Sequence, residues 1–118
     1  MEIIGERING MFKDIREAVK SQDKKPVQEW AVRQTENGVT WLDVNTGASA
    51  EDQMATMKWL IGASQEVVDT PLSLDSTNYD IIEEGIKLCK RPALINSCHA
   101  DRYKIERVFP MAVNIMQK

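Results

Sequence analysis

The chain is poor in the residues that build covalent or metal-based sites. Among its 118 residues are two cysteines, Cys89 and Cys98, and one histidine, His99. Two cysteines are too few for an iron–sulfur or structural zinc site, and one histidine does not make a typical zinc site. No secretory signal is recognisable at the N-terminus, so we expect reduced thiols and a cytoplasmic location. We expect no metal site and no nucleophile–histidine catalysis here.

Signals for nucleotides, nucleic acids and membranes are also missing. Neither G-x-G-x-x-G nor G-x-x-x-x-G-K-[ST] occurs, and GERING matches neither pattern. The 15 basic residues are scattered among 18 acidic ones, and the net charge is −3, which gives no reason to expect nucleic acid. No apolar run approaches the roughly 18 residues of a membrane span. The composition therefore predicts a single globular domain that binds neither nucleic acid nor membrane.

What the sequence does contain is a regular alternation of strand and helix patterns. Runs rich in β-branched and apolar residues predict strands at 2–8, 39–45, 71–75 and 92–96. Residues with helical spacing predict helices at 12–19, 26–37, 54–68, 79–89 and 103–115. Strands that alternate with amphipathic helices indicate βα units and a mainly parallel α/β sheet.

Polar residues stand at the end of each predicted strand. These are Asn9, Asp43, Asn45, Asp75, Asn78, Asn96 and Ser97. Because the carboxyl ends of parallel strands meet on one face, and ligands bind there in α/β folds, these side chains are candidates for a binding site. They are acceptors and amides, and they do not form a nucleophile with its base.

Each candidate also has a structural interpretation. Asp75 could cap the helix that follows it, and Ser76 and Thr77 are interpreted as caps rather than as catalytic residues. Asn96 could be a turn residue, and Asp43 and Asn45 could serve strand-end turns. Glu6-Arg7 could face the mouth of the sheet or form a structural ion pair, and the pair is favoured.

Four stretches together resemble a known family: "IIGERINGMF", "PVQEWAVRQTENGVTWLDVNTG", "PLSLDSTN" and "ALINSCHADRYKIERVFPMAV". They are similar to the methyltetrahydrofolate:corrinoid (iron–sulfur) protein methyltransferases. These are pterin-binding enzymes, as are dihydropteroate synthase and the folate domain of cobalamin-dependent methionine synthase. The resemblance covers essentially the whole chain.

The resemblance implies a (β/α)8 barrel of the TIM type, frequently dimeric, that holds the pterin ring of methyltetrahydrofolate in its C-terminal mouth. The N5 methyl group would pass to or from the cobalt of a corrinoid carried by a partner protein. By motif, Asp75 and Asn96 would contact the pterin. Asp43 and Asn45 match the second-strand motif near the pocket.

The chain is short for that fold. A complete barrel has about 250 residues, so residues 1–118 correspond to its N-terminal half, with about four βα units. The family's N5-facing Asn and a further pterin-binding Asp would lie in the other half, and we expect little transfer by this chain alone. Open edges and an uncovered apolar face predict a homo-oligomer.

Two alternatives remain open. One is a dihydropteroate-synthase-like enzyme, although no obvious basic site for a pyrophosphate leaving group is present. The other is a non-catalytic half-barrel that binds a pterin or serves as a structural module.

Overall fold

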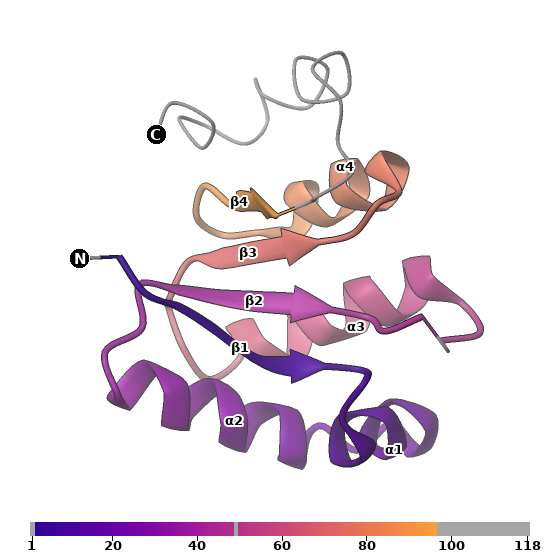
Figure 1. Ribbon diagram of the computed structural model, residues 1–118, viewed down its shortest axis with the longest axis horizontal. Helices are drawn as coiled ribbons and strands as arrows, with labels where there is room; N and C mark the ends of the chain where they lie inside the picture. The colour runs from indigo at the N-terminus through magenta and orange to yellow at the C-terminus, as the bar shows by residue number, and fades with distance from the viewer. Residues whose placement is uncertain (1, 49, 97–118) are drawn as a thin grey trace.

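The structure, a computed structural model, describes residues 2–48 and 50–96 (Figure 1). Within these ranges four strands alternate with four helices. In chain order they are β1 (Ile4–Asn9), α1 (Lys13–Ser21), α2 (Lys25–Glu36), β2 (Trp41–Asn45), α3 (Gln53–Gln65), β3 (Leu72–Asp75), α4 (Tyr79–Leu88) and β4 (Leu94–Asn96). The strands form one sheet in the order β1-β2-β3-β4, and every neighbouring pair is parallel. This confirms the α/β fold with a parallel sheet; the helix predicted at 103–115 lies outside the described residues.

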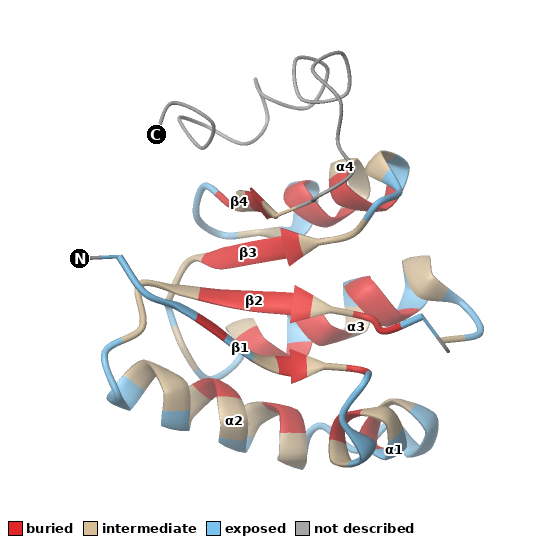
Figure 2. Cartoon of the chain, in the orientation of Figure 1, coloured by how far each residue is buried: buried red, intermediate tan, exposed pale blue. Residues whose placement is uncertain are grey.

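One face of the sheet is covered by helices. Helices α2, α3 and α4 pack side by side against the strands, and α1 packs on α2 (Figure 1). The buried layer between them, red in Figure 2, includes Ile8, Leu42, Val44, Leu72, Leu74, Ile61 and Ile82. Helix α4 comes close to β3 because position 85 is glycine: a Cβ there would lie 2.9 Å from Leu74 Cδ1. Apolar residues at every second strand position therefore anchor the sheet to its helices.

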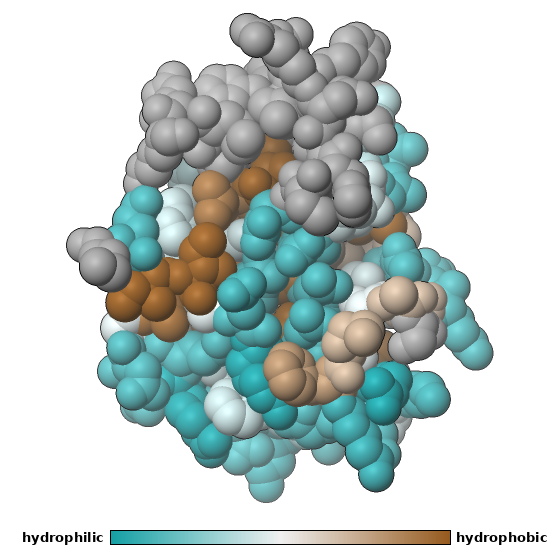
Figure 3. All heavy atoms as spheres, in the orientation of Figure 1, coloured by the Kyte–Doolittle hydropathy of each residue, from teal (hydrophilic) through white to brown (hydrophobic). Residues whose placement is uncertain are grey.

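The other face carries the intervening strand residues. Alternation places Asp43, Asn45, Ser73, Asp75 and Asn96 on the side away from the helices. Figure 3 views the molecule from this side: hydrophilic residues occupy its middle, and hydrophobic ones gather near the N-terminus. There Ile3 and Ile4 are exposed. The face that a barrel would turn inward thus combines a polar centre with an apolar margin.

Local signals placed most element boundaries correctly. Pro26 lies in the first turn of α2, and the helix ends before Gly38, whose φ is +88°. The strands are a few residues shorter than predicted, and α3 ends at Gln65 rather than near position 68. Phe12 was expected on the apolar face of α1, which was wrong: it precedes that helix and is 43% exposed.

Candidate functional site

The ends of the four strands are in register. Asn9 pairs with Asn45, Asn45 with Asp75, and Asp75 with Asn96. The row crosses the whole sheet at its carboxyl edge (Figure 1). The structure therefore brings Asn45, Asp75 and Asn96 together, as expected from parallel strands that end in polar residues.

Asp43 lies two residues before Asn45 and is enclosed by neighbouring strands. Only 2% of its surface is exposed. Its Oδ1 accepts a hydrogen bond from Ser73 Oγ at 2.9 Å and another from Asn96 Nδ2 at 3.0 Å. Ser73, which is fully buried, was not singled out from the sequence. The signal was available, because Ser73 precedes Asp75 by two residues and so shares its face.

The surroundings of Asp43 favour its protonated form. Burial is the main cause, and it raises the pKa of Asp43 to about 7. The hydrogen bonds from Asn96 and Ser73 act in the opposite direction. The negative charge of Asp75, and a hydrogen bond between the two carboxyl groups, add to the effect of burial. Asp43 and Asp75 therefore form a carboxyl pair, and residues whose pKa is perturbed as that of Asp43 is concentrate at functional sites.

Asn45 and Asn9 hold loops at the strand ends. The Asn45 side-chain oxygen accepts from Gly47 N at 2.8 Å, and that of Asn9 accepts from Met11 N at 2.9 Å. The two loops touch, since Gly10 N donates to the backbone oxygen of Asn45 at 3.0 Å. Gly47 has φ +80°, and a Cβ there would lie 2.8 Å from the carbonyl carbon of Gly10. Asn45 was interpreted either as a pocket residue or as a residue of the strand-end turn, and its side-chain oxygen bonds within the turn.

Asp75 does not cap the helix that follows it. The cap of α4 is Asn78, whose Oδ1 accepts from Asp80 N at 2.9 Å and Ile81 N at 3.4 Å. Ser76 and Thr77 were interpreted as caps rather than catalysts; Ser76 Oγ accepts from Asn78 N at 3.1 Å, and the N-cap itself is Asn78. Since Asn78 satisfies the first turn, the Asp75 carboxyl remains available for contacts at the mouth.

Arg7 takes the structural role that was favoured, with a different partner. The register of β1 shifts between Gly5 and Ile8, which is the signature of a bulge at this edge. Arg7 Nη2 lies 2.9 Å from both oxygens of Asp14, and its guanidinium stacks on the rings of Phe12 at 4.0 Å and Trp30 at 4.3 Å. These contacts give Arg7 a structural role, in which it joins β1 to α1 and α2.

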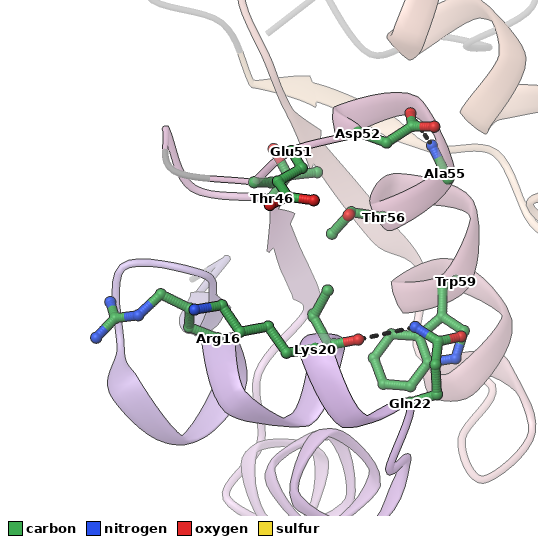
Figure 4. Close-up of a pocket in the computed structure, with 11 residues that line it drawn as sticks. Arg16, Lys20, Gln22, Thr46, Glu51, Asp52, Ala55, Thr56 and Trp59 are labelled. Atoms are coloured by element: carbon green, nitrogen blue, oxygen red, sulfur yellow. Dashed lines mark hydrogen bonds between the residues drawn. The ribbon is translucent and has the colours of Figure 1, made fainter.

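A separate cavity of about 510 Å³ lies between α1 and α3 (Figure 4). Its lining includes Arg16, Lys20, Thr46, Asp52, Thr56 and Trp59, and none of Asp43, Asp75 or Asn96.

Across residues 2–48 and 50–96 no group of three metal-ligating side chains gathers. None of the helices described is long and apolar enough to cross a membrane. The strand-end cluster of Asp43, Ser73, Asp75 and Asn96 is therefore the candidate site.

Comparison with known proteins identifies the family of the chain. The profile of the family described as pterin-binding enzyme matches residues 7–116. The chain therefore belongs to the pterin-binding enzymes, a family of the TIM-barrel type.

Two curated relatives are informative. The chain is 34% identical over 111 residues to a methylcorrinoid:tetrahydrofolate methyltransferase of Eubacterium limosum, covering 94% of this chain and 41% of that protein. It is 32% identical over 96 residues to a methionine synthase of Mycobacterium leprae, covering 80% of this chain and 8% of that protein. The chain thus spans less than half the length of these relatives.

Proposed function

We propose that residues 1–118 form the N-terminal half of a pterin-binding (β/α)8 domain. The enzyme would move the N5 methyl group between methyltetrahydrofolate and the cobalt of a corrinoid on a partner protein. The observation that carries the proposal is the register of Asp75 and Asn96 at the carboxyl edge of the sheet. The pterin would be held there, with Asp43 and Asn45 supporting the pocket.

The chemistry of these side chains suits a reduced pterin ring. The amide nitrogen of Asn96 donates to Asp43, and the carbonyl oxygen of Asn96 remains available to accept a hydrogen bond from the ligand. The Asp75 carboxylate also accepts, so two neighbouring acceptors meet a ring edge that is rich in N–H donors. Both stand on strand ends, where side chains are fixed before the reaction. The reduced corrinoid would supply the nucleophile, so the site needs none of its own.

The relatives favour methyl transfer over other pterin chemistry. One is named for transfer between a methylcorrinoid and tetrahydrofolate, and the other is a methionine synthase. Part of the mouth of a complete barrel would come from residues beyond these four strands. We therefore expect the chain alone to transfer methyl groups poorly.

Substitution of the two acceptors tests the proposal in the full-length protein. Asp75→Asn and Asn96→Ala should each weaken methyltetrahydrofolate binding, measured by calorimetry, by about 10- to 100-fold, since each removes a buried hydrogen bond. The rate of methyl transfer from methyltetrahydrofolate to reduced cobalamin, followed by absorbance, should fall with them.

Asp69→Asn is the matched control, because Asp69 is exposed just before the opposite end of the same strand. Unchanged affinity in Asp75→Asn and Asn96→Ala would refute the proposed pterin site. Tight binding without any transfer would instead identify a non-catalytic pterin-binding module.

We also propose that the chain self-associates. Among the described strands β1 and β4 are the outer ones, and Ile3 and Ile4 are exposed at the start of β1. Open edges and apolar surface promote association. Light scattering on the purified chain should give more than the mass of one copy, and a stable monomer would contradict this.

A further inference from the structure

Asp43 is the most enclosed charged residue of the candidate site, and it contacts both proposed pterin-binding side chains. It is 2% exposed, whereas Asp75 and Asn96 are both half-buried. One of its oxygens, Oδ1, accepts from Asn96 Nδ2 at 3.0 Å and from Ser73 Oγ at 2.9 Å. A residue so placed is poorly situated to touch a ligand directly, but well situated to orient the residues that do.

The groups that interact with Asp43 come from β3 and β4. On β3 they are Asp75, a second carboxyl group, and Ser73, a neutral donor; on β4 the group is the neutral amide of Asn96. On β1, Glu6 is exposed and Arg7 is paired with Asp14. A buried carboxyl that interacts with a second carboxyl carries a proton more readily than a charge, because two neighbouring negative charges repel each other and burial removes water.

We propose that Asp43 is a positioning residue that works in its protonated form, donating its proton to the Asp75 carboxylate while its Oδ1 fixes the Asn96 amide. The proton lies between the two carboxyl groups, and the single negative charge stays on Asp75. Asn96 is held with its nitrogen inward, so its carbonyl oxygen points away from Asp43. Asp43 therefore orients Asn96 so that its carbonyl oxygen, like the Asp75 carboxylate, is available as an acceptor at the rim. Asp43 does this without touching the ligand.

Loss of that proton would disturb the contact with Asp75, whereas Asp43 Oδ1 would still accept from Asn96. An ionised Asp43 repels Asp75, and the hydrogen bond between the two carboxyl groups is lost. Asparagine at position 43 mimics the protonated acid, since its oxygen still accepts from Ser73 and Asn96 and its nitrogen donates to Asp75. Alanine can do neither. The two substitutions therefore separate a positioning role from a charged ligand contact.

The binding experiment rests on the proposed function and uses the full-length protein with methyltetrahydrofolate as the probe. At pH 6.5, Asp43→Asn should keep its dissociation constant within about threefold of the wild type, whereas Asp43→Ala should weaken binding by about 10- to 100-fold. Between pH 6 and 9 the affinity of the wild type should fall relative to that of Asp43→Asn. Because both proteins bind the same ligand, any protonation change of the ligand affects both affinities equally and cancels in their ratio.

A second measurement does not depend on the ligand. Carbon-13 NMR of the aspartate carboxyl groups should show Asp43 titrating near neutral pH. The Asn96 side-chain amide signals should shift with the same midpoint in the wild type and stay constant in Asp43→Asn. If methyltetrahydrofolate does not bind at all, the proposed function fails and this coupling alone decides the positioning role.

Three results would overturn the inference. One is an Asp43 carboxyl signal that titrates near pH 4. Another is a set of Asn96 side-chain amide signals that do not shift when Asp43 titrates. The third is an Asp43→Asn variant that loses as much affinity as Asp43→Ala, since that would make Asp43 a charged ligand contact.

Discussion

Asp14 is partly buried and Asp43 almost fully buried, and the two regions shift the pKa of these carboxyl groups in opposite directions. Burial acts to raise the pKa of Asp14, but hydrogen bonds from Trp30 and Arg7, together with the charge of Arg7, hold that pKa below its usual value. Burial also dominates at Asp43, where the neighbours are neutral donors and a second carboxyl, and the pKa rises to about 7. The two groups differ in burial and in the charge of their neighbours, which is a guanidinium at Asp14 and a second carboxyl at Asp43.

The two environments suit different tasks. Around Asp14 a cation, an indole N–H and two aromatic rings satisfy a fixed charge, and this joins β1 to α1 and α2. Around Asp43 the charge is disfavoured, which costs stability at neutral pH and leaves a proton that can be moved. Strain of this kind is expected at a site used for binding or chemistry and is not needed in a structural joint.

The largest expected effect is on the pH dependence of stability. A folded-state pKa above the unfolded value means that the folded chain holds the Asp43 proton longer. Its stabilising contribution is therefore complete below about pH 4 and is lost as pH rises through about 7. Across this window the wild type should lose up to about 4 kcal/mol relative to Asp43→Asn.

Urea unfolding at pH 4, 6 and 8 measures this difference. Asp43→Asn should be similar to the wild type at pH 4 and more stable at pH 8. Parallel stability curves for the two proteins would show that folding does not raise the pKa of Asp43 and that the contrast with Asp14 is false.

The second prediction removes the cation that sets the two regions apart. Arg7→Ala should lower the free energy of unfolding by about 2 kcal/mol, because it leaves Asp14 partly buried without its ion pair and strips two aromatic contacts. Arg33→Ala is the matched control: Arg33 stacks on the same Trp30 ring at 4.6 Å but is exposed. It should cost no more than about 0.5 kcal/mol. Equal losses in the two variants, measured by thermal unfolding, would assign the effect to stacking alone.

These two regions also show how far the sequence could be interpreted. Periodicity gave the parallel sheet, and the strand-end rule gave the row that contains Asp75 and Asn96, because both depend on backbone geometry that short patterns encode. The partner of Arg7 was not predictable in the same way. Asp14 is seven residues away and reaches Arg7 through a bulge, and no local pattern specifies that contact.

The burial of Asp43 was equally unpredictable from the sequence. Its donors come from positions 30 and 53 residues further along the chain. Ser73 stood two residues before Asp75 and could have been found by alternation. The protonation of Asp43 could not, since it depends on burial and on the distance between two carboxyl groups.

The third prediction concerns acid. The pKa of Asp14 is lowered on folding, so its contribution is present above about pH 4 and is lost as pH falls through the folded value. Asp14→Asn should therefore be less stable than the wild type at pH 7 by about 1 kcal/mol, a modest value because the side chain is 39% exposed and water screens the pair. The difference should shrink toward pH 2, the reverse of the Asp43→Asn trend. Urea unfolding at pH 2.5 and 7 tests this, and a constant difference would mean that packing rather than charge is lost.

The smallest effect should come from Ser73, and it tests the balance at Asp43 from the other side. The Ser73 hydroxyl donates to Asp43 Oδ1 and so lowers the pKa that burial raises. Ser73→Ala removes this donor, and the pKa of Asp43 should rise further, so the loss of stability with rising pH should continue to a higher pH. The change in stability at pH 5 should stay below about 1 kcal/mol, because one hydrogen bond to a mostly protonated acid is lost. Ser76→Ala removes a hydroxyl that bonds to Asn78 instead, and it should leave the pH profile in place. A profile that moves to lower pH in Ser73→Ala would mean that the hydroxyl accepts the Asp43 proton, and the proton would then not be shared with Asp75.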